Sequence, residues 1–278
     1  MIDGLVVVDK DAGWTSHDVV AKCRGRFKQK RIGHSGTLDP DATGVLLVGL
    51  GRATRLLKYL TDLPKTYTGE VVLGTATSTL DASGEVTGEW DMSGVTLEQA
   101  QAAAVPLTGP ILQVPPMVSA LKVGGKRLHE LARAGIEVER EARPVTVHRF
   151  RVSATTEPRV LAVEVECSSG TYIRTLAADL GTALGGGAHL RNLRRTAIGS
   201  FTLADAHALE ALTDDHVLSP AEALRDYPSV EIDADQRTAV GYGRPIAGLP
   251  AGTVGLLSEG ALVAVYEDGK PSVVLAPA

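Results

Sequence analysis

Two carboxylates in a glycine-rich loop are the residues with the clearest chemical potential. The stretch from Gly33 to Gly44 reads GHSGTLDPDATG and places Asp39 and Asp41 on either side of a proline. An ionised aspartate can act as a nucleophile, and a pair of carboxylates can divide the roles of acid and base in hydrolysis. An Asp-Pro pair also forms turns without any chemistry. Side chains two residues apart point in different directions in an extended segment, so an acid/base pair of Asp39 and Asp41 is not implied, and a turn is the simplest interpretation of the loop alone.

The same loop lacks the residues that a phosphate-binding loop requires. A P-loop continues through Lys and Ser or Thr into a helix, whereas Gly44 is followed by the apolar run Val45–Leu50. The fingerprint of a dinucleotide-binding fold is absent from the sequence too. Cys23 and Cys167 are the two cysteines, and neither lies in a Cys/His cluster, so neither a metal site nor a disulfide framework is predicted.

Short strands and helices must hold this loop in place. Gly4–Lys10 is rich in β-branched residues and predicts a strand, and Thr15–Asp18 is a capping pattern that begins a helix with apolar residues at helical spacing. Residues 31–44 are too rich in glycine and Asp-Pro to form a helix or a regular strand, so a structured loop is predicted. A strand at residues 45–50 and a helix around residues 55–60 follow.

The rest of the chain mixes strands with helices and then changes character. Strands are predicted at residues 67–74, 145–152 and 160–167, and helices at residues 128–134 and 171–184. After about residue 225 short β-like stretches dominate, and Asp268-Gly269 marks a hairpin turn. This order predicts an α+β fold with a mixed, mainly antiparallel sheet and flanking helices, plus a small β-rich C-terminal domain.

The net charge of −5 is distributed unevenly along the 278 residues. Residues 1–200 hold 24 Lys and Arg against 21 Asp and Glu, whereas residues 201–278 hold 4 against 12. Six cations with no acid among them lie between residues 22 and 31: Lys22, Arg24, Arg26, Lys28, Lys30 and Arg31. Such a run is either a solvated helix face or a stripe that contacts nucleic-acid phosphates. An RNA-facing surface is therefore expected within the first 200 residues.

The sequence predicts a protein of the cytoplasm. The first four residues include an acid and lack the basic flank and apolar run of a signal peptide. No later apolar run approaches the length of a membrane span, so no membrane association is expected. Hydrophobic residues make up 44% of the chain, which is enough to build a core and argues against disorder.

Several segments share a resemblance to one known family. They are Gly33–Gly44, the opening Gly4–Lys10, Lys65–Tyr67, Pro115–Lys126, Ser169–Leu176, and Gly187–Leu190 with Leu193–Thr196. The first closely resembles the catalytic-aspartate motif of the bacterial tRNA pseudouridine-55 synthases, the TruB-type family of pseudouridine synthases. The others match the same family in the same order, so the resemblance extends over roughly residues 4–200.

The resemblance implies an isomerase that converts the uridine at position 55 in the T-loop of tRNA to pseudouridine. In such enzymes the uridine is flipped out, and its base leaves C1′ and rejoins it through C5 without any cofactor. The implied organisation is a catalytic pseudouridine synthase domain over residues 1–225, with an RNA-gripping insertion near residues 115–145, and a PUA-like domain over residues 226–278. The implied partner is the T-arm stem-loop, and a monomer without an obligatory protein partner is expected.

The resemblance also assigns candidate site residues. Catalytic roles are implied for Asp39 as the nucleophile, Tyr67 as the aromatic residue that stacks on the target base, and Arg174 as the cation that pairs with the aspartate. Substrate contacts are implied for His34, Tyr172, Leu193, Arg55 and Lys10. The resemblance implies contacts with the RNA backbone for Lys122, Lys126 and Arg127, and the cationic run described above predicts them for Lys22 and Arg24. Arg55 stands where several relatives carry lysine, which changes the geometry of its contact.

Two other classes of protein are alternatives. A non-catalytic RNA-binding protein would use Asp39 only as a turn former, but the co-occurrence of Asp39, Tyr67 and Arg174 argues against it. A hydrolase or phosphoryl-transfer enzyme would need a loop lysine, a metal cluster or a nucleophile beside a base. The sequence shows none of these patterns, so the isomerase is the favoured interpretation.

Overall fold

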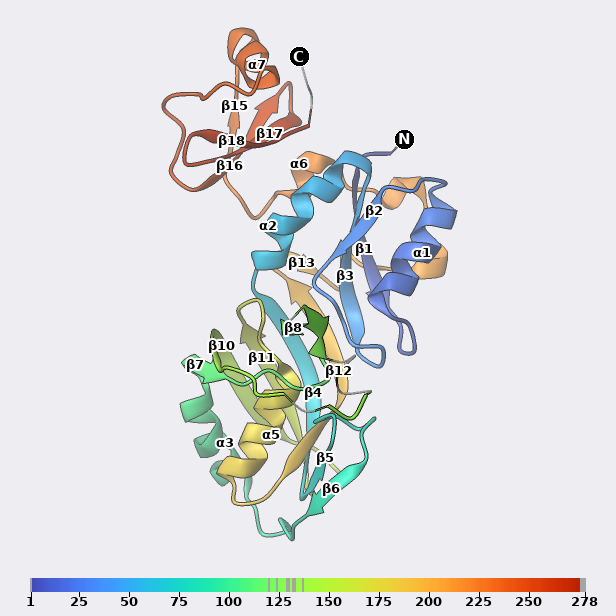
Figure 1. Cartoon of the computed structure of the whole chain (residues 1–278), viewed down its shortest axis with the longest axis vertical. Coiled ribbons are helices and arrows are strands. Elements are labelled where there is room, and N and C mark those ends of the chain that lie inside the picture. Colours follow the sequence, from blue (N-terminus) through green and yellow to red (C-terminus); the bar gives the residue numbers. More distant parts are fainter. Residues whose placement is uncertain are drawn as a thin grey trace. The chain divides into compact units, whose positions relative to one another are not determined.

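Figure 1 shows a computed structural model of the chain, which describes residues 2–119, 121–123, 125–128, 131, 134–136 and 138–275. The chain divides into two units. The first combines Met1–Leu63 with Ala197–Ala278, and the second is Pro64–Thr196. No helix among the described residues is long and apolar enough to cross a membrane.

The centre of the first unit is an antiparallel pair of apolar strands. The strand β1 (Gly4–Lys10) runs beside β3 (Thr43–Leu50), with Gly4 opposite Leu50 and Lys10 opposite Gly44. The short strand β14 (His207–Ala208) pairs parallel with β1. Because β1 and β3 are covered on both faces, they contain the uninterrupted apolar runs Leu5–Val8 and Val45–Val48 and do not alternate.

The expectation that residues 31–44 contain no regular strand is wrong for their first part. Ile32–Ser35 form the strand β2, which pairs antiparallel with β3. Gly33 serves close packing here, because a Cβ at this position would lie 3.1 Å from a methyl carbon of Leu57. Pairing with an available strand edge overrides the loop signal of the glycines. The irregular segment is confined to residues 36–42.

The helix that follows β1 begins where its capping pattern predicts. In α1 (Ser16–Arg26) the Thr15 side chain accepts from the Asp18 amide, and the Asp18 carboxylate accepts in return from the Thr15 amide. Val19, Val20 and Cys23 are buried in one core cluster with residues of β1 and β3. The 3-10 helix η1 (Gly51–Leu56) and α2 (Leu57–Asp62) follow β3, as predicted around residues 55–60.

The end of the chain forms a small sheet of its own, as the sequence predicts. Its strands are ordered β15 (Ser229–Glu231), β16 (Thr253–Ser258), β17 (Ala261–Glu267) and β18 (Lys270–Val274). The turn between β17 and β18 has positive φ at both Asp268 and Gly269, which confirms the predicted hairpin. The short elements β13 (Phe201–Thr202), η3 (Leu209–Ala211), η4 (Asp214–His216) and α6 (Pro220–Ala223) precede this sheet.

This small sheet contributes to two hydrophobic cores. Val263 and Tyr266 pack with residues of α7 (Ala234–Gly241) in a core that belongs to the C-terminal part alone. Val265 and Leu275 instead belong to a core that also holds Leu56 and Tyr59 of the helices after β3, together with residues of β1 and β3. The C-terminal sheet is therefore a structural part of the first unit and not a tethered appendage.

The second unit is built on a sheet with the order β12-β4-β11-β10-β7. Its strands are β4 (Lys65–Leu73), β7 (Gly109–Gln113), β10 (Arg143–Ala154), β11 (Val160–Cys167) and β12 (Ala188–Ile198). The helices α3 (Leu97–Ala104) and α5 (Ile173–Ala183) lie side by side on it, as Figure 1 shows. The 3-10 helix η2 (Val105–Leu107) and the hairpins β5–β6 (Thr75–Thr77, Val86–Glu89) and β8–β9 (Lys122–Val123, Lys126–Arg127) complete the unit.

The predicted fold class is confirmed. Most strand pairs among the described residues are antiparallel, with parallel pairs at β1–β14 and β15–β16, and helices flank the sheets. The predicted helix at residues 128–134 lies partly outside the described residues. The boundary at residue 225, the limits of the insertion near residues 115–145 and the PUA likeness of residues 226–278 stay predictions.

We expect the shared core to couple the stability of the C-terminal sheet to that of β1 and β3. Leu275 is 4% exposed, so Leu275→Ala should lower the free energy of unfolding by about 2–5 kcal/mol. Hydrogen exchange should accelerate in β1 and β3 as well as in β17. Leu112→Ala, at a position that is 73% exposed, is the matched control and should change stability little. Faster exchange confined to residues 229–274 would contradict the shared core.

Candidate active site

The loop that carries Asp39 is held by a buried lysine. Lys10, at the end of β1, is 1% exposed, and its ammonium donates to the carbonyl oxygens of Asp11 (2.9 Å), Trp14 (2.8 Å) and Pro40 (2.9 Å). The Gly13 amide donates to the same Pro40 oxygen at 3.0 Å. The turn after β1 therefore fixes the peptide that follows Asp39. This is a positioning contact, different from the substrate contact that the family resemblance implies for Lys10.

The peptide before Asp39 is held by the first residue of α1. The hydroxyl of Ser16 accepts from the Leu38 amide at 2.9 Å and donates to the Leu38 carbonyl oxygen at 3.3 Å. Ser16 and Leu38 are both buried, whereas Asp39 is half-buried and Asp41 is exposed. Because the peptides before and after Asp39 are both hydrogen-bonded, the position of Asp39 has little freedom. A group that acts as a nucleophile needs such fixed placement. The sequence indicated the loop but gave no sign of Ser16.

The other candidates in the first unit lie in different surroundings. His34, on β2, is half-buried and meets the exposed His17 of α1 edge to face, with ring centroids 5.3 Å apart. Lys22 and Arg24 are exposed on α1, and Arg24 donates to the Ile32 carbonyl oxygen at 3.3 Å. An exposed cationic stripe is therefore present where the sequence predicts one.

Arg55 lies among cations that contact the C-terminal sheet. Its Nη1 donates to the carbonyl oxygen of Val274 at 2.5 Å, and Arg52 donates likewise to that of Leu275 at 2.7 Å. One helical turn further on, Lys58 pairs with Glu267 at 2.9 Å. The described contact of Arg55 therefore ties η1 to β18, and its predicted substrate contact stays untested.

The aromatic and apolar candidates of the second unit lie on its sheet and at a helix start. Tyr67 is on β4 opposite Val165 and is 8% exposed, and Leu193 is half-buried on β12. Tyr172 is half-buried and is the N-cap residue of α5, where its side chain makes no capping hydrogen bond. Arg174 follows two residues later, in the first turn of that helix.

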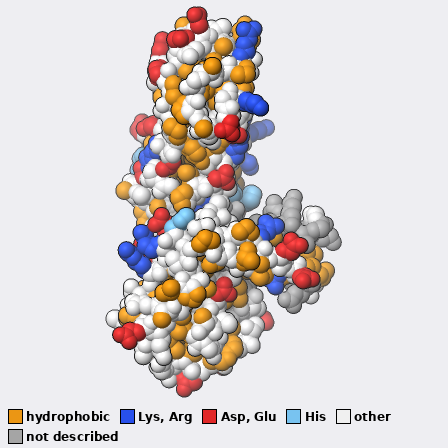
Figure 2. Space-filling model, turned by 90° about the vertical axis from the view of Figure 1, so that its left-hand side faces the viewer, with side chains coloured by type: hydrophobic (Ala, Val, Ile, Leu, Met, Phe, Trp, Pro, Cys, Tyr) orange, Lys and Arg blue, Asp and Glu red, His pale blue; other side chains and the backbone are white. Residues whose placement is uncertain are grey.

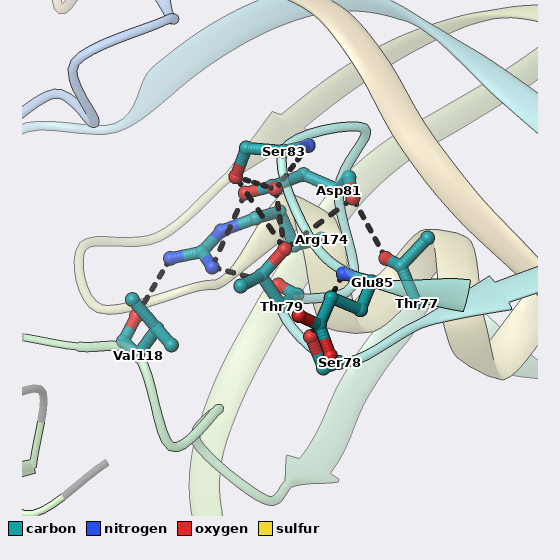
Figure 3. Close-up of polar contacts among 8 residues, drawn as sticks. All are labelled: Thr77, Ser78, Thr79, Asp81, Ser83, Glu85, Val118 and Arg174. Atoms are coloured by element: carbon teal, nitrogen blue, oxygen red, sulfur yellow. Dashed lines mark hydrogen bonds and ion pairs between the residues drawn. The ribbon is translucent and has the colours of Figure 1, made fainter. Parts of the chain in front are cut away.

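Arg174 is a buried cation whose guanidinium contacts Thr79, Asp81 and Val118 (Figure 3). It is 4% exposed, and its guanidinium donates to the carbonyl oxygens of Thr79 and Val118, both at 2.8 Å. The carboxylate of Asp81 lies 3.4 Å from Nη1. A buried guanidinium needs a counter-charge and hydrogen-bond acceptors, and these residues supply both.

Asp81 is itself fixed by the loop between β5 and β6. Its Oδ1 accepts from the Thr79 hydroxyl (2.6 Å), the Ser83 hydroxyl (2.6 Å) and the Ser83 amide (3.1 Å), while Oδ2 faces Arg174. One carboxylate oxygen thus orders the loop and the other faces the cation. The sequence analysis missed Asp81, although the Asp-x-Ser turn pattern and an arginine in an apolar helix were available as signals.

The candidates are distributed over both units. Asp39, His34, Lys10, Arg55, Lys22 and Arg24 belong to the first unit, and Tyr67, Arg174, Tyr172 and Leu193 belong to the second. The side chains of Lys122, Lys126 and Arg127 lie outside the described ones. The pairing of Arg174 with Asp39 stays a prediction.

Metal and thiol chemistry have no support among the described residues. No group of three or more His, Cys, Asp or Glu side chains there could hold a metal ion. Burial raises the pKa of the Cys23 and Cys167 thiols to about 11, so both remain protonated at neutral pH. Neither cysteine is suited to act as a nucleophile.

Comparison with known families identifies the fold and its chemistry. The model of the N-terminal domain of TruB family pseudouridylate synthases matches residues 24–173, more than half of the chain. The chain belongs to the TruB family. The model of the tRNA pseudouridylate synthase B C-terminal domain matches the adjoining residues 174–227. The resemblance stated from the sequence and the expected enzyme class, an isomerase that forms pseudouridine, are thereby confirmed.

Curated relatives match along nearly the whole chain. The tRNA pseudouridine synthase B of Arthrobacter sp. (strain FB24) is 47% identical over 299 residues, which covers 100% of this chain and 98% of the relative. The protein of the same name from Rhodococcus jostii (strain RHA1) is 51% identical over 248 residues, with 87% of this chain and 81% of the relative covered.

Solved structures share the TruB fold. A chain in a Cbf5-Nop10-Gar1 complex has a TM-score of 0.74 and 26% identity, covering 99% of this chain and 84% of that chain. A chain in an H/ACA RNP bound to a substrate RNA containing 2′-deoxyuridine also has a TM-score of 0.74, at 24% identity, with 99% of this chain and 85% of that chain covered. The second likeness concerns the fold alone.

We expect loss of the Asp81 charge to impair pseudouridine formation through Arg174. Asp81→Asn keeps the side-chain shape but removes the counter-charge of a buried cation, so the guanidinium should shift. The single-turnover rate should fall about 10- to 100-fold, since small misplacements of catalytic groups have effects of this size. Glu85→Gln removes an exposed charge from the same hairpin and should leave the rate unchanged. A folded Asp81→Asn variant with the wild-type rate would contradict this role.

Proposed function

We propose that this enzyme is a tRNA pseudouridine synthase that converts uridine 55 in the T-loop of tRNA, with Asp39 as the nucleophile on a flipped-out uridine. The observation that carries the proposal is that both peptides flanking Asp39 are hydrogen-bonded to buried side chains. Ser16 bonds to Leu38 on one side, and Lys10 bonds to Pro40 on the other. A turn former would not need such support. The names of the curated relatives support the choice of tRNA as substrate.

The reaction is an isomerisation, so atoms balance without a co-reactant. The bond between N1 of uracil and C1′ of the ribose breaks, a bond between C5 and C1′ forms, and the proton on C5 is lost while N1 gains one. After the first bond has broken and before the second forms, the intermediate is bound covalently to the aspartate nucleophile. No metal or organic cofactor is required in this proposal.

Tyr67 and Arg174 complete the catalytic set in this proposal. Extrusion of the uridine costs a few kcal/mol, and stacking on one aromatic side chain returns roughly 1–3 kcal/mol. Tyr67 supplies that stacking surface, and Tyr172 and Leu193 line the uracil pocket. Arg174 holds Asp39 ionised and oriented, as a guanidinium does for a carboxylate. The firm anchoring of Arg174 supports a role that depends on exact placement.

RNA binding is assigned mainly to the cationic elements of the first 200 residues. Lys22 and Arg24 on α1 contact phosphates, His34 contacts the RNA loop, and Lys122, Lys126 and Arg127 grip the T-arm. Acidic side chains are visible on the C-terminal part, uppermost in Figure 2, which supports a placing or stabilising role for that PUA-like part. The enzyme works in the cytoplasm as a monomer, without an obligatory protein partner.

The decisive test separates the carboxylate of Asp39 from its place in the turn. Asp39→Asn should fold, bind a T-arm hairpin with near-native affinity and release no tritium above background from C5-labelled uridine. Asp41→Asn is the matched control, because Asp41 is exposed and has no assigned chemical step. If Asp39→Asn retained turnover while Asp41→Asn lost it, the wrong carboxylate would have been chosen. Activity in both variants would refute the mechanism.

The isolated T-arm hairpin should be a substrate, and its binding should weaken steeply as salt rises. Each phosphate contact that is lost lowers the slope of log K against log salt by about one. Lys22→Gln should therefore reduce both affinity and slope while the saturated rate stays unchanged. Lys270→Gln removes an exposed lysine of β18 and should change neither quantity. A hairpin that is inert while whole tRNA reacts would overturn this prediction.

A further inference from the structure

We propose that Gln113 is a positioning residue for the first turn of α5, and that it acts on the reaction through Arg174 and Tyr172. The proposal rests on the proposed function, because it takes Arg174 to act beside the reacting uridine. Gln113 is the last residue of β7 and is 59 residues away from Tyr172 in the sequence. No motif identified from the sequence includes it.

The side-chain amide of Gln113 makes a two-way hydrogen bond with one backbone residue. Its Oε1 accepts from the Tyr172 amide at 2.7 Å, and its Nε2 donates to the Tyr172 carbonyl oxygen at 3.1 Å. Gln113 is 3% exposed, so the amide is paired away from water. Two bonds to the same residue fix both the position and the rotation of the chain there, which a single bond cannot do.

Tyr172, the residue held by these two hydrogen bonds, lies at the start of α5. Tyr172 is the N-cap and makes no side-chain cap of its own, so the support usually given by a local Ser, Thr or Asp comes from another strand. The Tyr172 carbonyl oxygen also accepts the first helical bond, from the Leu176 amide at 3.2 Å. Arg174 lies within this first turn, so the grip on Tyr172 sets where its side chain starts.

A second contact shows that the strand end and the helix start are held together. The carbonyl oxygen of Val118, five residues after Gln113, accepts from Nη2 of Arg174 at 2.8 Å. Between them lie Pro115 and Pro116, whose rings restrict the backbone. Residues 113–118 are thus tied to α5 at both ends. If the bonds between Gln113 and Tyr172 were lost, the Val118 carbonyl oxygen that accepts from Arg174 would change its position.

Gln113→Met is the main test, because methionine has nearly the same length but offers neither amide hydrogen bond. We expect its single-turnover rate at saturating T-arm hairpin to fall about 10- to 100-fold, with the dissociation constant for the hairpin unchanged. Gln101→Met is the matched control: the Gln101 amide also donates to a backbone oxygen, that of Val152 at 3.0 Å, but not at the start of α5. It should react at the wild-type rate.

A double-variant cycle with Arg174→Lys shows whether Gln113 acts through Arg174. If it does, Gln113→Met should slow the Arg174→Lys enzyme much less than it slows the wild type. Equal losses in both backgrounds, or a wild-type rate in folded Gln113→Met, would overturn the proposal. If Gln113→Met fails to fold, Gln113→Glu decides by the same criteria, since it keeps the acceptor for the Tyr172 amide and loses the donor.

The same experiments separate this proposal from the proposed function. Arg174→Lys alone should fall steeply in rate, because an ammonium cannot replace a planar guanidinium with several fixed acceptors. If Arg174→Lys or Asp39→Asn reacted at the wild-type rate, the proposed mechanism would fail. If both were slow while folded Gln113→Met reacted normally, only the positioning role of Gln113 would be refuted.

Discussion

Burial of the Arg174 guanidinium is the constraint on which the second unit depends. A cation removed from water is tolerated only where counter-charge and acceptors replace the lost hydration. Here two segments far from Arg174 in the sequence supply them: the loop after β5 through Thr79 and Asp81, and the chain after β7 through Val118. The cation therefore organises its surroundings. The β5–β6 loop and the chain after β7 both contact this one side chain at the start of α5.

The first unit meets a similar need with one lysine and one serine. Asp39 lies in an irregular segment, where backbone groups lack the partners that a strand or helix provides. Ser16 and Lys10 supply those partners from the ends of α1 and β1, which are themselves fixed by a capping box and by strand pairing. The position of Asp39 is thus supported by hydrogen bonds to the neighbouring peptides of Leu38 and Pro40, whereas Arg174 is held by contacts of its own guanidinium.

The sequence was informative wherever the signal was local. The β-branched run at Gly4–Lys10, the capping box at Thr15 and the Asp268-Gly269 turn all predicted the elements that form. It failed at Ile32–Ser35, where pairing with β3 overrides glycine. The residues it missed in the site, Ser16, Gln113 and Asp81, make hydrogen bonds or ion pairs with partners 22 to 93 residues away. A local pattern such as Asp-x-Ser indicates the turn at Asp81 but not the distant partner.

The division of the chain has a consequence for the order in which its parts fold during synthesis. The second unit is one continuous stretch, Pro64–Thr196, whereas the first joins Met1–Leu63 to Ala197–Ala278. Chains fold as they leave the ribosome, domain by domain. The stretch 64–196 can close before synthesis ends, but β1 and β3 must wait for Val265 and Leu275, which complete their core. Residues of β1 and β3 are thus synthesised long before the partners that complete their core, and the nascent enzyme leaves this apolar face exposed until Val265 and Leu275 emerge.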